Sequence, residues 1–149
     1  MNKIFFSLIL LVTISSGFAQ TNEELQKMAD ADQEERFNGT DWKIRNKHDS
    51  IRLTKATKLF NNGALKTAKD YYNAGIIFQH GNDTIASKMA VESFKKAIEM
   101  DSTLNRWWYA AAVDRDLMRR DEPQIYGTQY IGNGSGKQKQ YKMDTTQVS

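Results

Sequence analysis

Apolar residues recur at helical spacing along most of this chain, and no stretch alternates apolar and polar residues long enough to predict a strand. Glycines and the single proline interrupt this pattern and mark where helices should end. The pattern predicts helices over residues 21–37, 47–61, 64–80, 84–101 and 104–120. We therefore expect an all-α fold of about five helices that pack as antiparallel pairs.

Two of these helices begin with capping signals. Thr21 and Glu24 stand at the spacing of a capping box, and Thr84 follows the turn Gly81-Asn82-Asp83 as a helix N-cap. The segment 64–80 has apolar residues on more than one face, which is typical of a helix with neighbours on two sides. We expect this segment to be the central helix.

Residues 1–19 have the composition of a secretory signal. Lys3 precedes an apolar stretch at residues 4–14, and small residues up to Ala19 are typical of a cleavage site. The apolar stretch is shorter than the roughly 20 residues of a membrane span, and no later segment is apolar enough to cross a bilayer. The sequence therefore predicts an exported protein, periplasmic or secreted after cleavage near Ala19, with no membrane span.

The rest of the chain divides by composition. Residues 20–131 are predicted to form a single helical domain, and residues 132–149 a flexible polar tail. The tail begins with a run of glycine, lysine and glutamine, whose apolar content is too low to offset the entropy of ordering the chain. We expect it to be disordered.

Composition and motifs exclude several kinds of site. The chain has no cysteine, which rules out disulfides and thiolate ligands, and its two histidines lack the spacing of a zinc site. No P-loop, nucleophile elbow or dinucleotide fingerprint is present, so no cofactor is expected. The formal net charge of +3 is too small to predict nucleic-acid binding. A protein, peptide or glycan partner fits this composition, and the sequence indicates no oligomeric state.

Asp114 lies on the apolar face of the helix predicted for residues 104–120. A buried carboxylate is costly unless a cation or several hydrogen-bond donors accompany it. The nearby segment 124–129 offers main-chain N–H groups and the side chains of Tyr126 and Thr128. Two interpretations follow: Asp114 fixes this loop to the helix, or it belongs to a functional site.

Arg115 follows Asp114 on the same helix and lies beside Trp108. Its guanidinium is expected to stack on the indole and to meet a carboxylate, either Asp32 or Asp70. Asp32 also stands four residues before Arg36, which is the spacing of an ion pair within a helix.

Gln79 and His80 end the predicted central helix. Gln79 falls on the apolar stripe of this helix, so its amide should be buried and hydrogen bonded. The position of His80 suits either an interaction with the helix C-terminus or catalysis.

These polar residues form one candidate cluster. Its catalytic candidates are His80 and Asp114. Its binding candidates come from four parts of the sequence and are Asp32, Gln79, Arg115, Gln124, Tyr126, Thr128 and Gln129.

Two resemblances to known families follow from these motifs. Residues 93–101 (Ser-Phe-Lys-Lys-Ala-Ile-Glu-Met-Asp) resemble the second helix of a tetratricopeptide repeat, which implies stacked antiparallel helix pairs. The Gln79-His80 and Asp114-Arg115 pairs, with the closing Gln-x-Tyr-Gly-Thr-Gln segment at 124–129, resemble an uncharacterised bacterial domain family. That resemblance implies a helical domain and brings no activity with it.

The sequence supports two functional hypotheses. The first is an exported helical binding module with a groove near the aromatic run 107–109. The alternative is a small envelope hydrolase or lyase that uses His80 and Asp114 as an acid/base pair. The absence of a complete catalytic set favours the first, although a purely architectural role for the polar cluster stays open.

Overall fold

A computed structural model describes residues 20–132 and 136–147, and the predicted signal segment 1–19 lies outside this range. Its five helices are α1 (Glu23–Phe37), α2 (Trp42–Asn61), α3 (Ala68–Gln79), α4 (Thr84–Met100) and α5 (Trp107–Arg119). Two short strands, β1 (Tyr130–Gly132) and β2 (Gln138–Gln140), and the 3₁₀ turn η1 (Thr145–Gln147) follow them. The predicted all-α class is confirmed. None of the described helices is long and apolar enough to cross a membrane.

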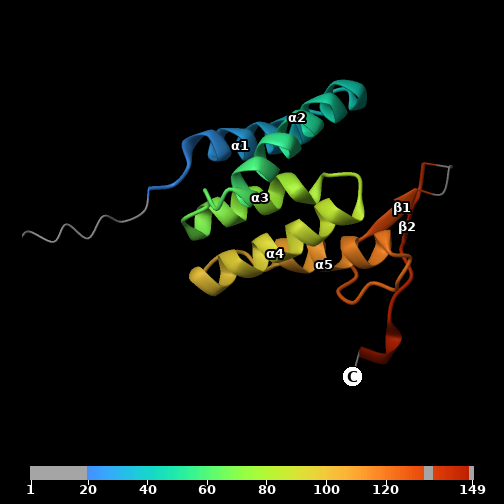
Figure 1. The fold of residues 1–149 in the computed structure, drawn as a ribbon. Coiled ribbons are helices and arrows are strands. Elements are labelled where there is room, and N and C mark those ends of the chain that lie inside the picture. The colour runs from blue at the N-terminus through green and yellow to red at the C-terminus, as the bar shows by residue number, and fades with distance from the viewer. Residues whose placement is uncertain (1–19, 133–135, 148–149) are drawn as a thin grey trace, which may run out of the picture.

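Helix α3 is central, as expected, because it packs against all four other helices and most extensively against α4. Figure 1 shows successive helices running in opposite directions, with α4 between α3 and α5. The core between them contains the fully buried Phe78 and Phe94 together with alanines. At Gly75 an added Cβ would lie 2.8 Å from the Phe94 ring, so α3 and α4 approach each other too closely there for a side chain. The helices pack in pairs as predicted, while a tetratricopeptide-like relationship stays a prediction.

The first and fourth helices begin with different caps from those predicted. The α1 cap is Asn22, whose side chain accepts a hydrogen bond from the Leu25 amide at 2.9 Å, and not a Thr21 capping box. The α4 cap is Asp83, which accepts from the Ala86 amide at 2.7 Å, so Thr84 is already helical. In both cases an Asn or Asp one residue away from the threonine supplies the capping oxygen.

Two other helices differ from the predicted starts. Helix α2 begins five residues early, after Asp41, whose carboxylate accepts hydrogen bonds from two amides of the first turn. Helix α3 begins later than predicted, at a capping box formed by Thr67 and Asp70. The buried Asp70 carboxylate also accepts a hydrogen bond from the Asn22 amide at 2.7 Å, which ties the start of α1 to the start of α3.

The C-terminal segment differs from the predicted disordered tail. Strands β1 and β2 pair antiparallel, with Tyr130 opposite Gln140, and Gln124 forms an isolated bridge with Met143. These pairs use main-chain groups, so the polar composition of the segment gave no sign of them. The segment therefore packs back onto the loop that follows α5.

Candidate functional site

Asp114 is completely buried on α5 and is held by the loop of residues 124–129. One carboxylate oxygen accepts hydrogen bonds from the amides of Ile125 (2.8 Å) and Tyr126 (2.9 Å). The other accepts from the amide and the hydroxyl of Thr128, both at 2.8 Å. Gly127, at φ +74°, provides the positive φ that turns the loop around the carboxylate. The predicted contact is confirmed, except that Tyr126 contributes its main chain while its side chain stays half exposed.

Gln124 joins this loop to the C-terminal segment. Its side chain accepts from the Gln129 amide at 2.8 Å and donates to the carbonyls of Gln129 (3.1 Å) and Tyr141 (2.9 Å). Its main chain donates to the Lys142 carbonyl and accepts from the Asp144 amide, both at 2.9 Å. Gln124 is fully buried, so these bonds satisfy polar groups that water does not reach.

Gln129 extends the network from the loop to α3. Its amide nitrogen and that of Gln79 both donate to the Ala111 carbonyl at 3.2 Å. Arg115 donates from Nε to Gln129 Oε1 at 3.0 Å and from Nη1 to the Gln79 carbonyl at 3.3 Å. The structure thus brings Gln79, Arg115, Gln124, Thr128 and Gln129 together with Asp114, as the candidate cluster predicted.

The partners predicted for Arg115 are wrong. Within the described residues it makes no ion pair with Asp32 or Asp70, because Asp32 is engaged by α1 and α2 and Asp70 caps α3. Trp108 packs instead against Phe94, with ring centroids 6.0 Å apart. Arg115 is therefore a half-buried cation whose hydrogen-bond partners are all uncharged.

His80 lies against Asp32 rather than Asp114. Its Nδ1 is 2.9 Å from Asp32 Oδ2, a close contact that is poorly aligned for a hydrogen bond. Burial lowers the pKa of His80, an effect that Asp32 opposes and that Arg36 and Arg115 strengthen. No described hydrogen bond or ion pair joins His80 to Asp114, because both oxygens of Asp114 face the 124–129 loop.

Behind His80, α1 and α2 are joined by a network of ion pairs. The predicted pair between Asp32 and Arg36 is present at 2.8 Å, and Arg36 also bonds Asp49 at 2.8 Å. The buried Arg52 bonds Glu35 at 2.7 Å and Asp49 at 2.8 Å. Burial alone would lower the pKa of Arg52, but these two carboxylates raise it overall. Both carboxylate oxygens of Asp49 are occupied by these arginines.

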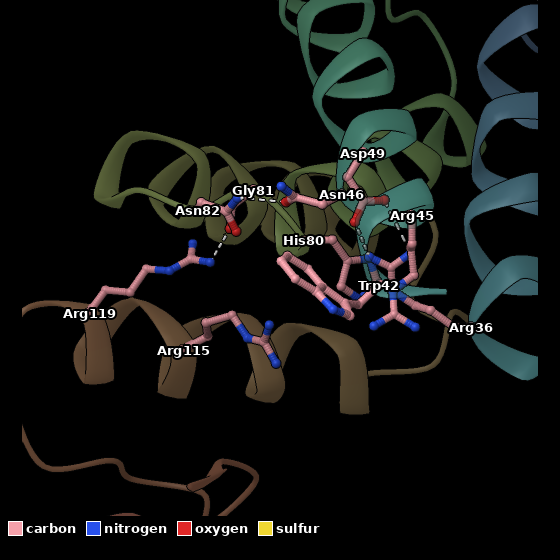
Figure 2. A pocket seen from close by; sticks show the side chains of 10 residues that line it. All are labelled: Arg36, Trp42, Arg45, Asn46, Asp49, His80, Gly81, Asn82, Arg115 and Arg119. Atoms are coloured by element: carbon pink, nitrogen blue, oxygen red, sulfur yellow. Dashed lines mark hydrogen bonds and ion pairs between the residues drawn. The ribbon is translucent and has the colours of Figure 1, made fainter. Parts of the chain in front are cut away.

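A cleft of about 470 Å³ opens where α2, the α3–α4 turn and α5 meet. We call it the arginine cleft, because four arginines line it. Figure 2 shows Arg115 and Arg119 extending from α5 into the cleft, with Arg119 reaching the turn that carries Gly81 and Asn82. The lining residues are Arg36, Trp42, Arg45, Asn46, Asp49, His80, Gly81, Asn82, Arg115 and Arg119.

The arginine cleft carries uncompensated positive charge. Among the residues that the structure describes, Arg45, Arg115 and Arg119 lie within ion-pair distance of no carboxylate, and the carboxylate of Asp49 is paired with Arg36 and Arg52, which it shares with Asp32 and Glu35. Burial, with the nearby Arg119 and Arg36, lowers the pKa of Arg115 to about 10, so it stays cationic at neutral pH. The cleft can therefore bind an anionic group through charge-assisted hydrogen bonds.

Of the residues that line this cleft, only His80 and Arg115 were among the site candidates predicted from the sequence. Sequence reasoning placed residues 42–46 outside a helix, so Trp42 and Arg45 were not brought beside α5. It also did not use the spacing of Arg115 and Arg119, which are four residues apart and share a face of α5. The predicted groove near residues 107–109 differs too, since none of these aromatic residues lines the arginine cleft.

No group of His, Asp or Glu side chains suited to a metal ion occurs in the part of the chain that the structure describes. Comparison with known proteins adds no relative, since no family model, no curated protein and no solved structure matches the chain. Membership of the uncharacterised bacterial family stays a prediction from the motifs.

Proposed function

We propose that this protein is an exported helical binding module whose arginine cleft receives a negatively charged group of its partner. The observation that carries the proposal is Arg115, a half-buried cation that faces the cleft and has no carboxylate partner among the described residues. Removing a charge from water without a counter-ion is costly, and a bound anion would restore that missing interaction.

The other lining residues suit recognition of a polar ligand. Trp42 is 62% exposed and offers an aromatic surface, while Asn46 and Asn82 offer amide groups. The volume of about 470 Å³ lies within the range of roughly 300–1,000 Å³ for ligand sites. These features fit an acidic peptide, an acidic protein surface or an anionic glycan.

The hydrolase or lyase alternative has less support. It requires His80 and Asp114 to act together, whereas Asp114 is fully buried and each of its oxygens already accepts two hydrogen bonds. A carboxylate satisfied in this way is suited to holding a loop. Binding of an anion by the arginines does not require His80 and Asp114 to act together.

Calorimetric titration with two anionic probes, a hexaglutamate peptide and a sulfated oligosaccharide, tests the proposal on the chain from residue 20. We expect at least one probe to bind, and Arg115→Gln to weaken it about tenfold or more through loss of charge-assisted bonds. Hexaglutamine and an unsulfated oligosaccharide are the matched neutral ligands.

Arg106→Gln is the matched control variant, because Arg106 is exposed and lies outside the cleft. It should leave affinity within about twofold of the wild type, since a distant exposed charge is screened. Equal binding of charged and neutral probes, or equal losses in the two variants, would contradict the proposal. Absence of binding by both anionic probes would count against it as well.

A further inference from the structure

We propose that Arg115 and Arg119 form a subsite for a tetrahedral oxyanion of the phosphate or sulfate type, an inference that rests on the proposed function and names its ligand class. The two arginines are one helical turn apart on α5 and both line the arginine cleft. Arg45 lines the same cleft from α2. Positive charge therefore approaches the cleft from two elements.

Arg115 is held in place, while part of its guanidinium has no acceptor among the described residues. Gln129 accepts from Nε, and the Gln79 carbonyl accepts from Nη1. A guanidinium has five N–H groups, so these two bonds leave three, including both on Nη2. Because Gln129 is anchored to Gln124 and to Ala111, the direction of Arg115 is fixed before a ligand binds.

Arg119 is fixed by the turn between α3 and α4. Its Nη1 donates to the Asp83 carbonyl at 2.9 Å, and its Nη2 donates to the Gly81 carbonyl. Both acceptors are uncharged carbonyls, while the nearby carboxylates of Asp83 and Asp116 partly oppose the lowering of the pKa of Arg119 by burial and do not form an ion pair with it. The turn thereby holds the second cation at the edge of the same cleft, as Figure 2 shows.

The arrangement favours a tetrahedral anion over a carboxylate. A carboxylate has two oxygens in one plane and is matched by a single guanidinium fork, whereas phosphate and sulfate present oxygens in several directions. The one carboxylate in the lining, Asp49, has both oxygens bonded by Arg36 and Arg52, so neither oxygen is turned toward the cleft without a hydrogen-bond donor.

The test is an NMR titration of the chain from residue 20 with inorganic phosphate, sulfate and acetate at constant ionic strength. Phosphate and sulfate should shift the Nε–H signal of Arg115 and the side-chain amide signal of Gln129, with affinities at least about tenfold above that of acetate. Glucose 6-phosphate, in a parallel arm, separates a phosphorylated sugar from the free ion. Tighter binding of glucose 6-phosphate indicates the sugar-linked group, and equal or weaker binding indicates the free anion.

Arg115→Lys keeps the charge and removes the planar fork, so it should weaken phosphate binding about tenfold, while Arg106→Gln should not. Affinity for acetate equal to that for phosphate, or full affinity in Arg115→Lys, would overturn the subsite. If phosphate and sulfate do not bind but hexaglutamate still binds through Arg115, the subsite is wrong and the binding module stands. If no anionic probe binds, both proposals fail.

Discussion

Arg115 donates its Nε–H to Oε1 of Gln129 over 3.0 Å, and this bond joins the loop that holds Asp114 to the residues that line the arginine cleft. The loop therefore has two roles in one structure. It satisfies a buried carboxylate on one side and orients a cleft cation on the other. A change in the loop should consequently alter both stability and binding.

Asp114→Asn should lower the free energy of unfolding by about 2–4 kcal/mol. The substituted amide places N–H groups where one carboxylate oxygen now accepts two hydrogen bonds, so donors face donors. Urea denaturation followed by circular dichroism measures the change. Asp30→Asn is the control at an exposed site on α1 and should change stability by less than about 0.5 kcal/mol. A loss of that small size in Asp114→Asn would contradict the role of this carboxylate.

Gln124→Ala should weaken anion binding without loss of the helices. The substitution removes three side-chain hydrogen bonds that fix Gln129 and the C-terminal segment. Hydrogen exchange should then speed up at the amides of Ile125 and Thr128, and affinity for the anionic probe should fall severalfold. Unchanged exchange at these amides would show that the loop keeps its conformation without the side chain of Gln124, which would contradict this prediction.

The pH dependence of stability should report the environment of His80. Its pKa is lower in the folded protein than its usual value near 6.5, so the unfolded chain takes up the proton first as the pH falls. This difference destabilises the fold progressively below about pH 6.5, until the pH passes the folded pKa.

His80→Gln removes this titration, so its melting temperature should fall less steeply than that of the wild type between about pH 7 and pH 5. Melting curves collected across this range compare the two slopes. Equal slopes of melting temperature against pH would mean that the pKa of His80 is not lowered in the folded protein.

Gly75→Ala should destabilise the protein by about 1–3 kcal/mol, although alanine is the better helix former. The added Cβ would lie 2.8 Å from the Phe94 ring, which forces α3 and α4 apart. Chemical denaturation of Gly75→Ala, of Phe94→Leu and of the double variant measures the coupling. The two losses should not add, because the smaller side chain leaves room for the methyl group.

The helices were predictable from sequence because their apolar periodicity is strong. The position of Asp114 on an apolar face predicted that its carboxylate would need partners, and the 124–129 loop was one of the two interpretations that followed. Helix starts were less predictable. Asn22 and Asp83 each stand beside a threonine that could also cap, and the geometry of the first turn decides between them. The choice depends on backbone angles that the residue types do not determine.

The cleft and the C-terminal strands could not be predicted from local sequence patterns, because both are formed by contacts between residues far apart in the chain. His80 meets Asp32 because of how α1 packs against α3, and no spacing along the chain encodes that packing. Gln124 bonds the main chain of Lys142 and Asp144, groups that every residue other than proline carries. Such pairings become visible only when the elements are placed in three dimensions.

The bonds between Gln124 and residues 141–144 also make the 124–129 loop depend on a segment that follows it in the sequence. Asp114 obtains its four hydrogen bonds when the 124–129 loop closes over it, and the later segment 141–144 adds further bonds to Gln124 at the start of that loop. Removing residues 141–144 would break the bonds that Gln124 makes to them but would leave the bonds between the loop and Asp114 in place. The orientation of Arg115 in the arginine cleft therefore depends, through Gln129 and Gln124, on residues that follow β2.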